Sequence, residues 1–389
     1  MEDDPLLTAD EAAELLGVRR QTIYAYVSRG QLQRHSEPGT RQSRFRQSDL
    51  DAMAKGDRAR QPGRSSPSNR TAVTSIVGGR LLYRERDAVD IAGALSFEQA
   101  AEWLWRAHEG AAPAWRPSAR PGSEAPALPL PDQCLPLDRL KIAAAGLGAV
   151  DPLRYDLSPH AVLAVARSLL PALVLALPAQ SDGAPPPAAD AGFAAALWPR
   201  LTASAAGDDR ARLLDQALIL SADHGLAPST RAVRTAASVA ADPYSVALTG
   251  MSVASGLRHG GSSLGVHSLL TDIGRPDRVE AVVSDHLRRG AALPGFGQPR
   301  YEGPDPRAGF LLGRLLGDRD ADPDRLAAVR EVVALVRERN DEHPSIEFAL
   351  GALCFLHDMV RGAGEAVFVL ARCVGWIAHA LEEYTDDAH

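Results

Sequence analysis

Arginines near the start of the chain are spaced in a way that suits contact with nucleic acid. Between residues 15 and 48 the sequence holds seven arginines and a single acidic residue, Glu37. Clustered guanidinium groups bind the phosphates of DNA and RNA. The charges also divide the chain, since residues 1–70 carry 12 Lys and Arg against 10 Asp and Glu, whereas the remaining residues carry 30 against 39. This division predicts a small basic module joined to an acidic body.

The elements that must position these arginines are predicted to be two short helices. Thr8 and Glu11 form a capping box that starts the first helix, and Gly17 ends it. A second helix is predicted from Arg19 to Ser28, and two helices joined by a turn that contains glycine are typical of a helix-turn-helix. The N-terminal end of the second helix would contact DNA through Arg19, Arg20, Gln21, Thr22 and Tyr24.

Residues 32–46 are predicted to form a hairpin wing with a Pro-Gly pair at its turn, and Arg44 of this wing is a further candidate for DNA contact. Another helix is expected to start at Ser48, with the Ser48 side chain as its cap. Residues 6–55 resemble the winged helix-turn-helix of the MerR/excisionase type, which implies DNA binding, with specific binding expected from a dimer. The alternative is a helical protein-interaction module with a solvated basic face.

The domain boundaries follow from composition. Residues 1–57 are predicted to be the DNA-binding domain and residues 71–389 the large domain. The segment between them, 58–70, is rich in Pro, Ser, Gly and Arg and reads as a flexible linker. Beyond residue 85 the apolar spacing is helical, so the fold class is mainly α. The stretch from Glu365 to Tyr384 is apolar over most of its surface and should be a helix buried on several sides.

Several classes of protein are excluded by the sequence. Its first residues are acidic and lack the apolar segment of a signal peptide, and the longest apolar run contains Arg167 and is shorter than the roughly 20 residues that cross a bilayer. We therefore expect a cytoplasmic protein without a membrane span. Metal binding is not expected either, because no two of the three cysteines have ligand spacing: Cys134, Cys354 and Cys373.

Six segments from residue 75 onward resemble, in order, motifs of the citrate synthase family. The family patterns are "YRG", "ADHELNAST", "PLHGGAN", "GFGH…DPRA", "PNVDF" and "ARTVGWIAH". The matching segments are Ser75–Arg84, Ser221–Thr230, Gly256–Gly261, Pro294–Ala308, Pro344–Phe348 and Ala371–His379. The resemblance implies an all-α domain with a small domain inserted at roughly 225–330. It also implies a homodimer whose active sites are completed across the interface.

The resemblance also implies roles for individual residues in the condensation of acetyl-CoA, or another acyl-CoA, with oxaloacetate. Glu347 would remove a proton from the acyl group, and His259 would stabilise the enol that forms. Gln298 stands where the family has the histidine that polarises the ketone of oxaloacetate. Oxaloacetate would be bound by His224, Arg307 and Arg372. CoA would be bound by Pro294, Gly295, Gly297 and Arg300. The acyl-CoA is a substrate or ligand, and no bound cofactor is expected.

Three departures from the family pattern predict weak condensation. Gln298 can donate a hydrogen bond but cannot carry charge. Glu347 replaces an aspartate, and its extra methylene moves the carboxylate by about an ångström, a displacement that can cost roughly 100-fold in rate. No arginine follows Arg372, whereas family members end with a basic segment that reaches the partner's active site.

These observations leave three functions open. The first is a citrate synthase, or a related condensing enzyme, with an attached DNA-binding module. The second is a DNA-binding transcriptional regulator that uses an impaired citrate synthase domain to sense acyl-CoA or a di- or tricarboxylate. The third is a pseudoenzyme that dimerises with a true citrate synthase.

Overall fold

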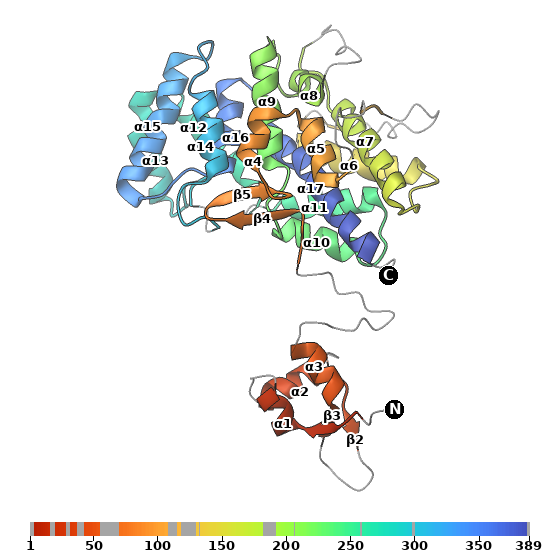
Figure 1. Cartoon of the computed structure of the whole chain (residues 1–389). Coiled ribbons are helices and arrows are strands. Elements are labelled where there is room, and N and C mark those ends of the chain that lie inside the picture. Colours follow the sequence, from red (N-terminus) through yellow and green to blue (C-terminus); the bar gives the residue numbers. More distant parts are fainter. Residues whose placement is uncertain are drawn as a thin grey trace. The chain divides into compact units, whose positions relative to one another are not determined.

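The computed structural model describes residues 4–15, 20–28, 32–36, 43–54, 70–107, 115–117, 130–131, 133–181, 192–205, 207–256, 259–297 and 300–386. The chain divides into two compact units, residues 1–65 and 66–389. Figure 1 shows a small unit of short helices and strands and a larger unit built mainly of helices. The fold is therefore mainly α, as the sequence predicts.

The described residues of the N-terminal unit form three helices and a three-stranded antiparallel sheet. Its elements are β1 (Leu6–Thr8), α1 (Ala9–Leu15), α2 (Arg20–Ser28), β2 (His35–Ser36), β3 (Ser43–Arg46) and α3 (Gln47–Ala54), with strand order β1-β3-β2. The core is small and contains Ala12, Ile23, Leu32, Phe45 and Leu50. The helix pair and the strand pair of the predicted wing are both present.

Hydrogen bonds of side chains hold the first turns of α1 and α3 in this unit. The predicted capping box is confirmed, because the Glu11 N–H donates to Thr8 Oγ1 over 3.3 Å and the Thr8 N–H donates to Glu11 Oε2 over 2.7 Å. The predicted start of the third helix is wrong by one residue, since α3 begins at Gln47. The Ser48 side chain does not cap this helix. Its hydroxyl and N–H donate to the carboxylate of Asp4, over 2.6 and 3.1 Å.

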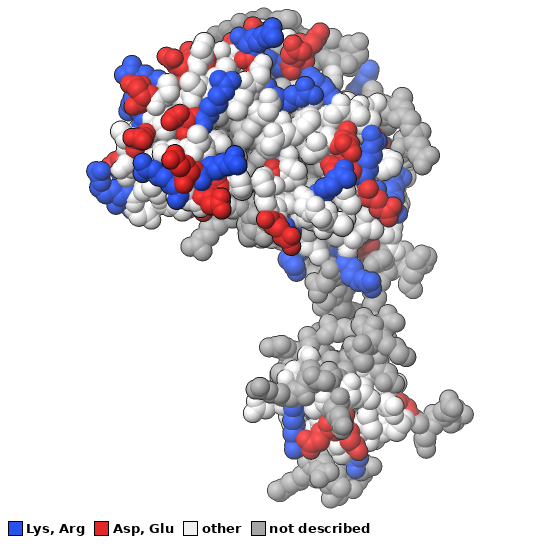
Figure 2. Space-filling model, turned by 60° about the vertical axis from the view of Figure 1, so that its left-hand side comes forward, with Lys and Arg blue, Asp and Glu red and all other residues white. Residues whose placement is uncertain are grey.

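The larger unit begins with a short antiparallel sheet, β4 (Thr74–Val77), β5 (Arg80–Tyr83) and β6 (Arg86–Asp87). The helices that follow are α4 (Ala88–Ala94), α5 (Phe97–Trp105), α6 (Pro136–Val150), α7 (Pro159–Leu175), α8 (Phe193–Leu201), α9 (Gly207–Ser221), α10 (Pro228–Ala237), α11 (Pro243–Ala254), α12 (Ser262–Ile273), α13 (Val279–Arg288), α14 (Pro306–Leu315), α15 (Pro323–Asn340), α16 (Ile346–Leu356) and α17 (Ala363–Asp386). Acidic and basic side chains intersperse over the visible face of this unit (Figure 2).

Helix α17 is the centre of the core. It contacts α5, α6, α7, α9, α10, α11, α12 and α16, and Figure 1 shows it running between them. The prediction of a helix buried on several sides is therefore confirmed. By length and composition alone, Ala363–Thr385 could cross a membrane, but 94% of its most apolar window is buried inside the fold, as in a core helix of a globular protein.

The first described residues of the larger unit are tied to α10 and α17. The Ala72 N–H and the Thr71 hydroxyl each donate to the carboxylate of Glu382, over 2.8 Å in both cases. Arg234 donates to the Arg70 carbonyl over 3.2 Å and forms an ion pair of 2.6 Å with Glu382. Buried or half-buried charged groups thus fix residues 70–72 against the helices of this unit.

The turn between β5 and β6 has an unusual backbone. Arg84 and Glu85 have φ angles of 48° and 73°, in the left-handed region that favours glycine. Glu85 occupies the position at which the "YRG" pattern has glycine. Its side chain is exposed.

Candidate active site

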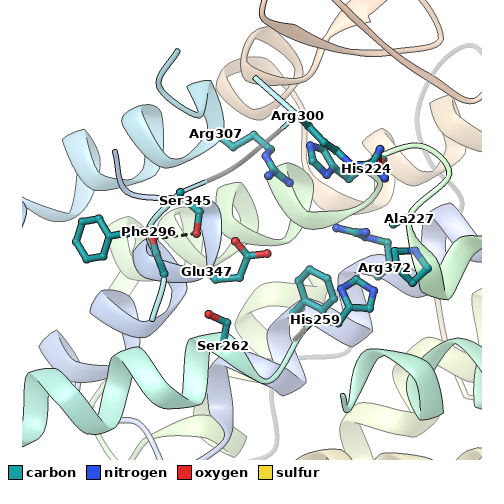
Figure 3. Close-up of a pocket in the computed structure, with 14 residues that line it drawn as sticks. His224, Ala227, His259, Ser262, Phe296, Arg300, Arg307, Ser345, Glu347 and Arg372 are labelled. Carbon is teal, nitrogen blue, oxygen red and sulfur yellow. Dashed lines mark hydrogen bonds between the residues drawn. The ribbon is translucent and has the colours of Figure 1, made fainter. Parts of the chain in front are cut away.

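A cavity of about 390 Å³ brings together most of the residues that were predicted to act in catalysis or to bind oxaloacetate and CoA. It is lined by His224, Ala227, Pro228, His259, Ser262, Gly295, Phe296, Gly297, Arg300, Arg307, Ser345, Glu347, Phe368 and Arg372. Pro294 does not line the cavity, and Gln298 lies outside the described residues. Figure 3 shows Arg307, Arg372, His259 and Glu347 converging on one space from different elements.

Arg307 and Glu347 are positioned by one carboxylate. Asp305 caps α14 by accepting the Arg307 N–H over 3.0 Å, and it forms a bidentate ion pair with the Arg307 guanidinium over 3.0 and 2.7 Å. It also accepts the N–H of Ile346, which precedes Glu347, over 3.1 Å. Burial alone would lower the pKa of Arg307, but Asp305 overrides it and raises that pKa above its usual value. Arg307 is therefore a permanent, fixed cation.

Arg372 of α17 is the second buried cation of the cavity and is only 2% exposed. Its Nε donates to the Ser221 carbonyl over 2.7 Å, and its guanidinium lies 4.5 Å from the centre of the Phe368 ring. Burial lowers its pKa, although a guanidinium stays charged at neutral pH. No carboxylate of the described residues lies within 4 Å of this guanidinium, so its terminal N–H groups are available to an anionic ligand.

The two histidines of the cavity are neutral near pH 7. His259 Nε2 lies 2.8 Å from the Ser229 hydroxyl, and burial, helped by Arg372 and Arg300, lowers the pKa of His259 to about 4. His224 Nε2 lies 2.9 Å from the Tyr301 hydroxyl, and burial, followed by nearby arginines, holds its pKa well below the usual value. Each imidazole can therefore donate or accept a hydrogen bond without carrying charge.

Glu347 is the single carboxylate among the described residues that line the cavity. It lies in the first turn of α16 and is partly exposed to the cavity. Figure 3 places its oxygens between Arg307 on one side and Ser262 and His259 on the other. A carboxylate beside a neutral imidazole and two fixed cations suits proton removal from a ligand whose negative charge the arginines hold.

Arg300 lies beside the loop that carries His224. Its guanidinium donates to the His224 carbonyl over 3.2 Å and to the Leu226 carbonyl over 3.4 Å, and the side chain is exposed. It adds a third positive charge to the cavity, away from the buried pair Arg307 and Arg372.

The candidate DNA-contacting residues are placed in part. Gln21 and Tyr24 are exposed on α2, and exposed Arg20 forms an ion pair of 3.2 Å with Asp10. Thr22 is partly exposed, and Arg19 lies outside the described residues. Arg44 is half-buried and donates to the Leu6 carbonyl over 3.3 Å, so part of its hydrogen-bonding capacity serves the sheet. Their role in DNA contact stays a prediction.

Sequence reasoning missed the partners of His224, His259 and Arg372, and it considered Asp305 only as a local ion-pair partner of Arg307. Ser229, Tyr301 and Asp305 hold His259, His224 and Arg307, and Phe368 packs under Arg372. The first three lie inside the quoted motifs, so their presence there was a usable signal. Phe368 lies outside the motifs and could have been found only from its helical spacing of four residues before Arg372.

Comparison with known proteins gives two family matches. The model of the family "Citrate synthase, C-terminal domain" matches residues 64–389, and the model "Helix-turn-helix domain" matches residues 6–58. A 2-methylcitrate synthase from Mycobacterium tuberculosis is 28% identical over 336 residues, which cover 82% of this chain and 85% of that protein.

Solved structures agree in fold. The citrate synthase from Thermotoga maritima superposes with a TM-score of 0.63 at 24% identity, covering 80% of this chain and 88% of that one. The citrate synthase from Thermoplasma acidophilum, solved with carboxymethyl coenzyme A and oxaloacetate, gives a TM-score of 0.63 at 20% identity, covering 81% and 89%.

Proposed function

Since the chain belongs to the citrate synthase family, we propose that its cavity binds an acyl-CoA together with oxaloacetate and joins them in a Claisen-type condensation. The observation that carries this proposal is the convergence of one carboxylate, Glu347, with the neutral His259 and two buried arginines. Carboxylate, neutral donor and paired cations are the groups that proton abstraction next to a thioester and binding of a dicarboxylate require.

In the proposed reaction, Glu347 takes a proton from the carbon next to the thioester, and His259 donates a hydrogen bond to the thioester oxygen. The enol carbon then attacks the ketone carbon of oxaloacetate, and a carbon–carbon bond forms as the C=O double bond opens. The ketone oxygen takes a proton from solvent to become a hydroxyl, and Glu347 returns its proton to solvent. Water cleaves the thioester and releases citrate and free CoA. Arg307, Arg372 and His224 hold oxaloacetate throughout, while Gly295, Gly297 and Arg300 contact CoA.

The condensation is proposed to be slow. Glu347 reaches about an ångström further than the aspartate of the family pattern, and Gln298 replaces an ionisable histidine. Free CoA thiol should therefore appear well below the roughly 1 to 1000 turnovers per second that are usual for enzymes. Acetyl-CoA and propionyl-CoA should be tested in parallel, because the cavity alone does not select the acyl chain.

The deciding experiment compares Glu347→Gln with Glu338→Gln, a change at an exposed glutamate of α15. Glu347→Gln should abolish thiol release, and Glu338→Gln should leave it unchanged. Fast release by the natural protein would refute the slow reaction, and equal release by both variants would refute the role of Glu347.

A second function, a DNA-binding regulator that senses these ligands, is supported by the helix-turn-helix match over residues 6–58. A regulator of this kind should release no thiol. Its melting temperature should rise with acetyl-CoA or oxaloacetate, and its DNA binding should change with either ligand. Fluorescence anisotropy of labelled DNA, with and without each ligand, separates the two functions. Homodimer formation is proposed for both, and light scattering coupled to size exclusion tests it.

A further inference from the structure

The loop that carries His224 is held from both sides by buried groups. Asp223 is 0% exposed, and its Oδ2 accepts the Gly225 N–H over 2.8 Å, so the carboxylate fixes the backbone just after His224. The Tyr83 hydroxyl accepts the Asp223 N–H over 3.1 Å and fixes the backbone just before it. The direction of His224 into the cavity thus depends on Asp223.

His379 of α17 contacts the carboxylate of Asp223. Its Nε2 lies 3.3 Å from Asp223 Oδ2, and its Nδ1 lies 3.2 Å from Arg234 Nη1. A guanidinium only donates hydrogen bonds, so Nδ1 accepts from Arg234. Nε2 then carries the proton and donates it to Asp223. The contact with Arg234 thus selects this tautomer, and both side chains are buried.

Helix α17 presses its backbone against the same loop. A Cβ atom at Gly375 would lie 2.4 Å from the Ala222 carbonyl oxygen and 2.5 Å from Asp223 Oδ1, so only glycine allows this approach. Arg372, Gly375 and His379 are spaced to share one face of the helix. One face therefore carries a ligand-binding cation, the contact with the loop, and the support for Asp223.

Asp223 also balances the charge of the ligand-binding arginine. Among the acidic groups of the described residues, Asp223 contributes most to stabilising the charged form of Arg372. Burial would raise the pKa of Asp223, but His379 and then Arg372 hold it at about 2, so the carboxylate is ionised. Loss of its charge or position would change both His224 and Arg372.

We propose that Asp223 and His379 form a positioning pair for the oxaloacetate side of the cavity, holding His224 and Arg372 in place before the ligand arrives. Neither residue of the pair lines the cavity, so they act through their neighbours. The proposal rests on the proposed function only for the identity of the ligand.

The test replaces His379 in two ways in the full chain. In His379→Gln the amide nitrogen reaches the place of Nε2 and can still donate to Asp223, whereas in His379→Asn the amide reaches only the place of Nδ1. We expect His379→Gln to bind oxaloacetate like the natural protein. We expect His379→Asn to bind it about 10- to 100-fold more weakly, the usual effect of losing a hydrogen bond to a buried charge. Calorimetry measures the affinity, and melting temperature measures stability.

Equal affinities of His379→Gln and His379→Asn for oxaloacetate would overturn the positioning pair, whether both match the natural protein or both are weaker. In either case the affinity would not depend on a hydrogen-bond donor to Asp223. Kinetics add a second readout, because His379→Asn should raise KM for oxaloacetate and leave KM for the acyl-CoA unchanged.

Failure of the pair is distinguishable from failure of the proposed function. If the natural protein does not bind oxaloacetate, the proposed function fails and the pair is tested without ligand. Amide hydrogen exchange over residues 221–226 should then be faster in His379→Asn than in His379→Gln. Equal exchange in both would again overturn the pair.

Discussion

At the scale of single residues, charge in the cavity is set by burial and by fixed partners. Arg307 has a carboxylate partner and Arg372 has none within 4 Å among the described residues, while both histidines are kept neutral. The cavity therefore carries fixed positive charge and neutral hydrogen-bonding groups. That combination favours an anionic ligand at neutral pH and sets how stability responds to acid.

The pKa of His259 predicts such a response. The unfolded chain binds a proton at His259 once the pH falls below about 6.5, whereas the folded protein does so only near pH 4. The stability that this histidine contributes is thus fully present above pH 6.5 and is lost between pH 6.5 and 4. His259→Gln should show a shallower fall in melting temperature over this range than the natural protein. His160→Gln, a change at an exposed site, is the control, and parallel curves for His259→Gln would contradict the prediction.

Restoring the family residues at positions 298 and 347 is predicted to raise the rate of condensation. Gln298→His together with Glu347→Asp should raise the rate of thiol release by up to about 100-fold, because the family's ionisable donor and its shorter base are restored. The double variant and each single variant should be assayed under the same conditions. A natural protein that is already fast and gains nothing would mean that these residues belong to a working variant site.

Much of the cavity is predictable from sequence because its charged residues lie in motifs. Sequence reasoning groups His224, His259 and Arg307, and the fold brings them to one cavity. Their orientation is not predictable in the same way. It depends on partners such as Tyr301, whose hydroxyl reaches His224 only after separate segments pack together.

At the scale of elements, helices are easier to predict than short strands. The buried helix α17 follows from a long apolar pattern, and the capping box at Ser96 and Gln99 marks the start of α5. Strand β1 is not predicted, because three residues show no alternation. It forms because β3 supplies hydrogen-bond partners, with Leu7 paired to Phe45 in the core.

The turn between β5 and β6 predicts a stabilising mutation. Glu85 has a φ of 73° and an exposed side chain, so Glu85→Gly should raise the free energy of unfolding by about 1 kcal/mol, the typical cost of left-handed backbone. Arg84→Gly is the matched comparison at a φ of 48°. It should gain less or lose stability, because Arg84 donates to the Leu104 carbonyl over 3.0 Å. Denaturant unfolding of both variants measures the difference, and a destabilised Glu85→Gly would contradict the strain.

At the scale of the whole molecule, two units with separate cores share one chain. The change in charge and composition near residue 70 predicts this division from sequence. The inserted small domain at roughly 225–330 stays a prediction. The sequence could not reveal that the segment after the predicted linker is bound by α10 and α17, because those partners lie more than 160 and 300 residues away.

That attachment decides where the two units can be cut apart. A fragment that starts at Arg70 keeps the groups that satisfy Glu382 and Arg234, whereas one that starts at Thr74 leaves a buried cation with fewer partners. The shorter fragment should melt several degrees lower, since it loses the hydrogen bonds from Thr71 and Ala72 to the Glu382 carboxylate and the bond from Arg234 to the Arg70 carbonyl, each worth about 1 to 3 kcal/mol. Calorimetry of both fragments checks this, and identical melting temperatures would contradict it. A fusion of another domain to the larger unit should therefore be joined before residue 70.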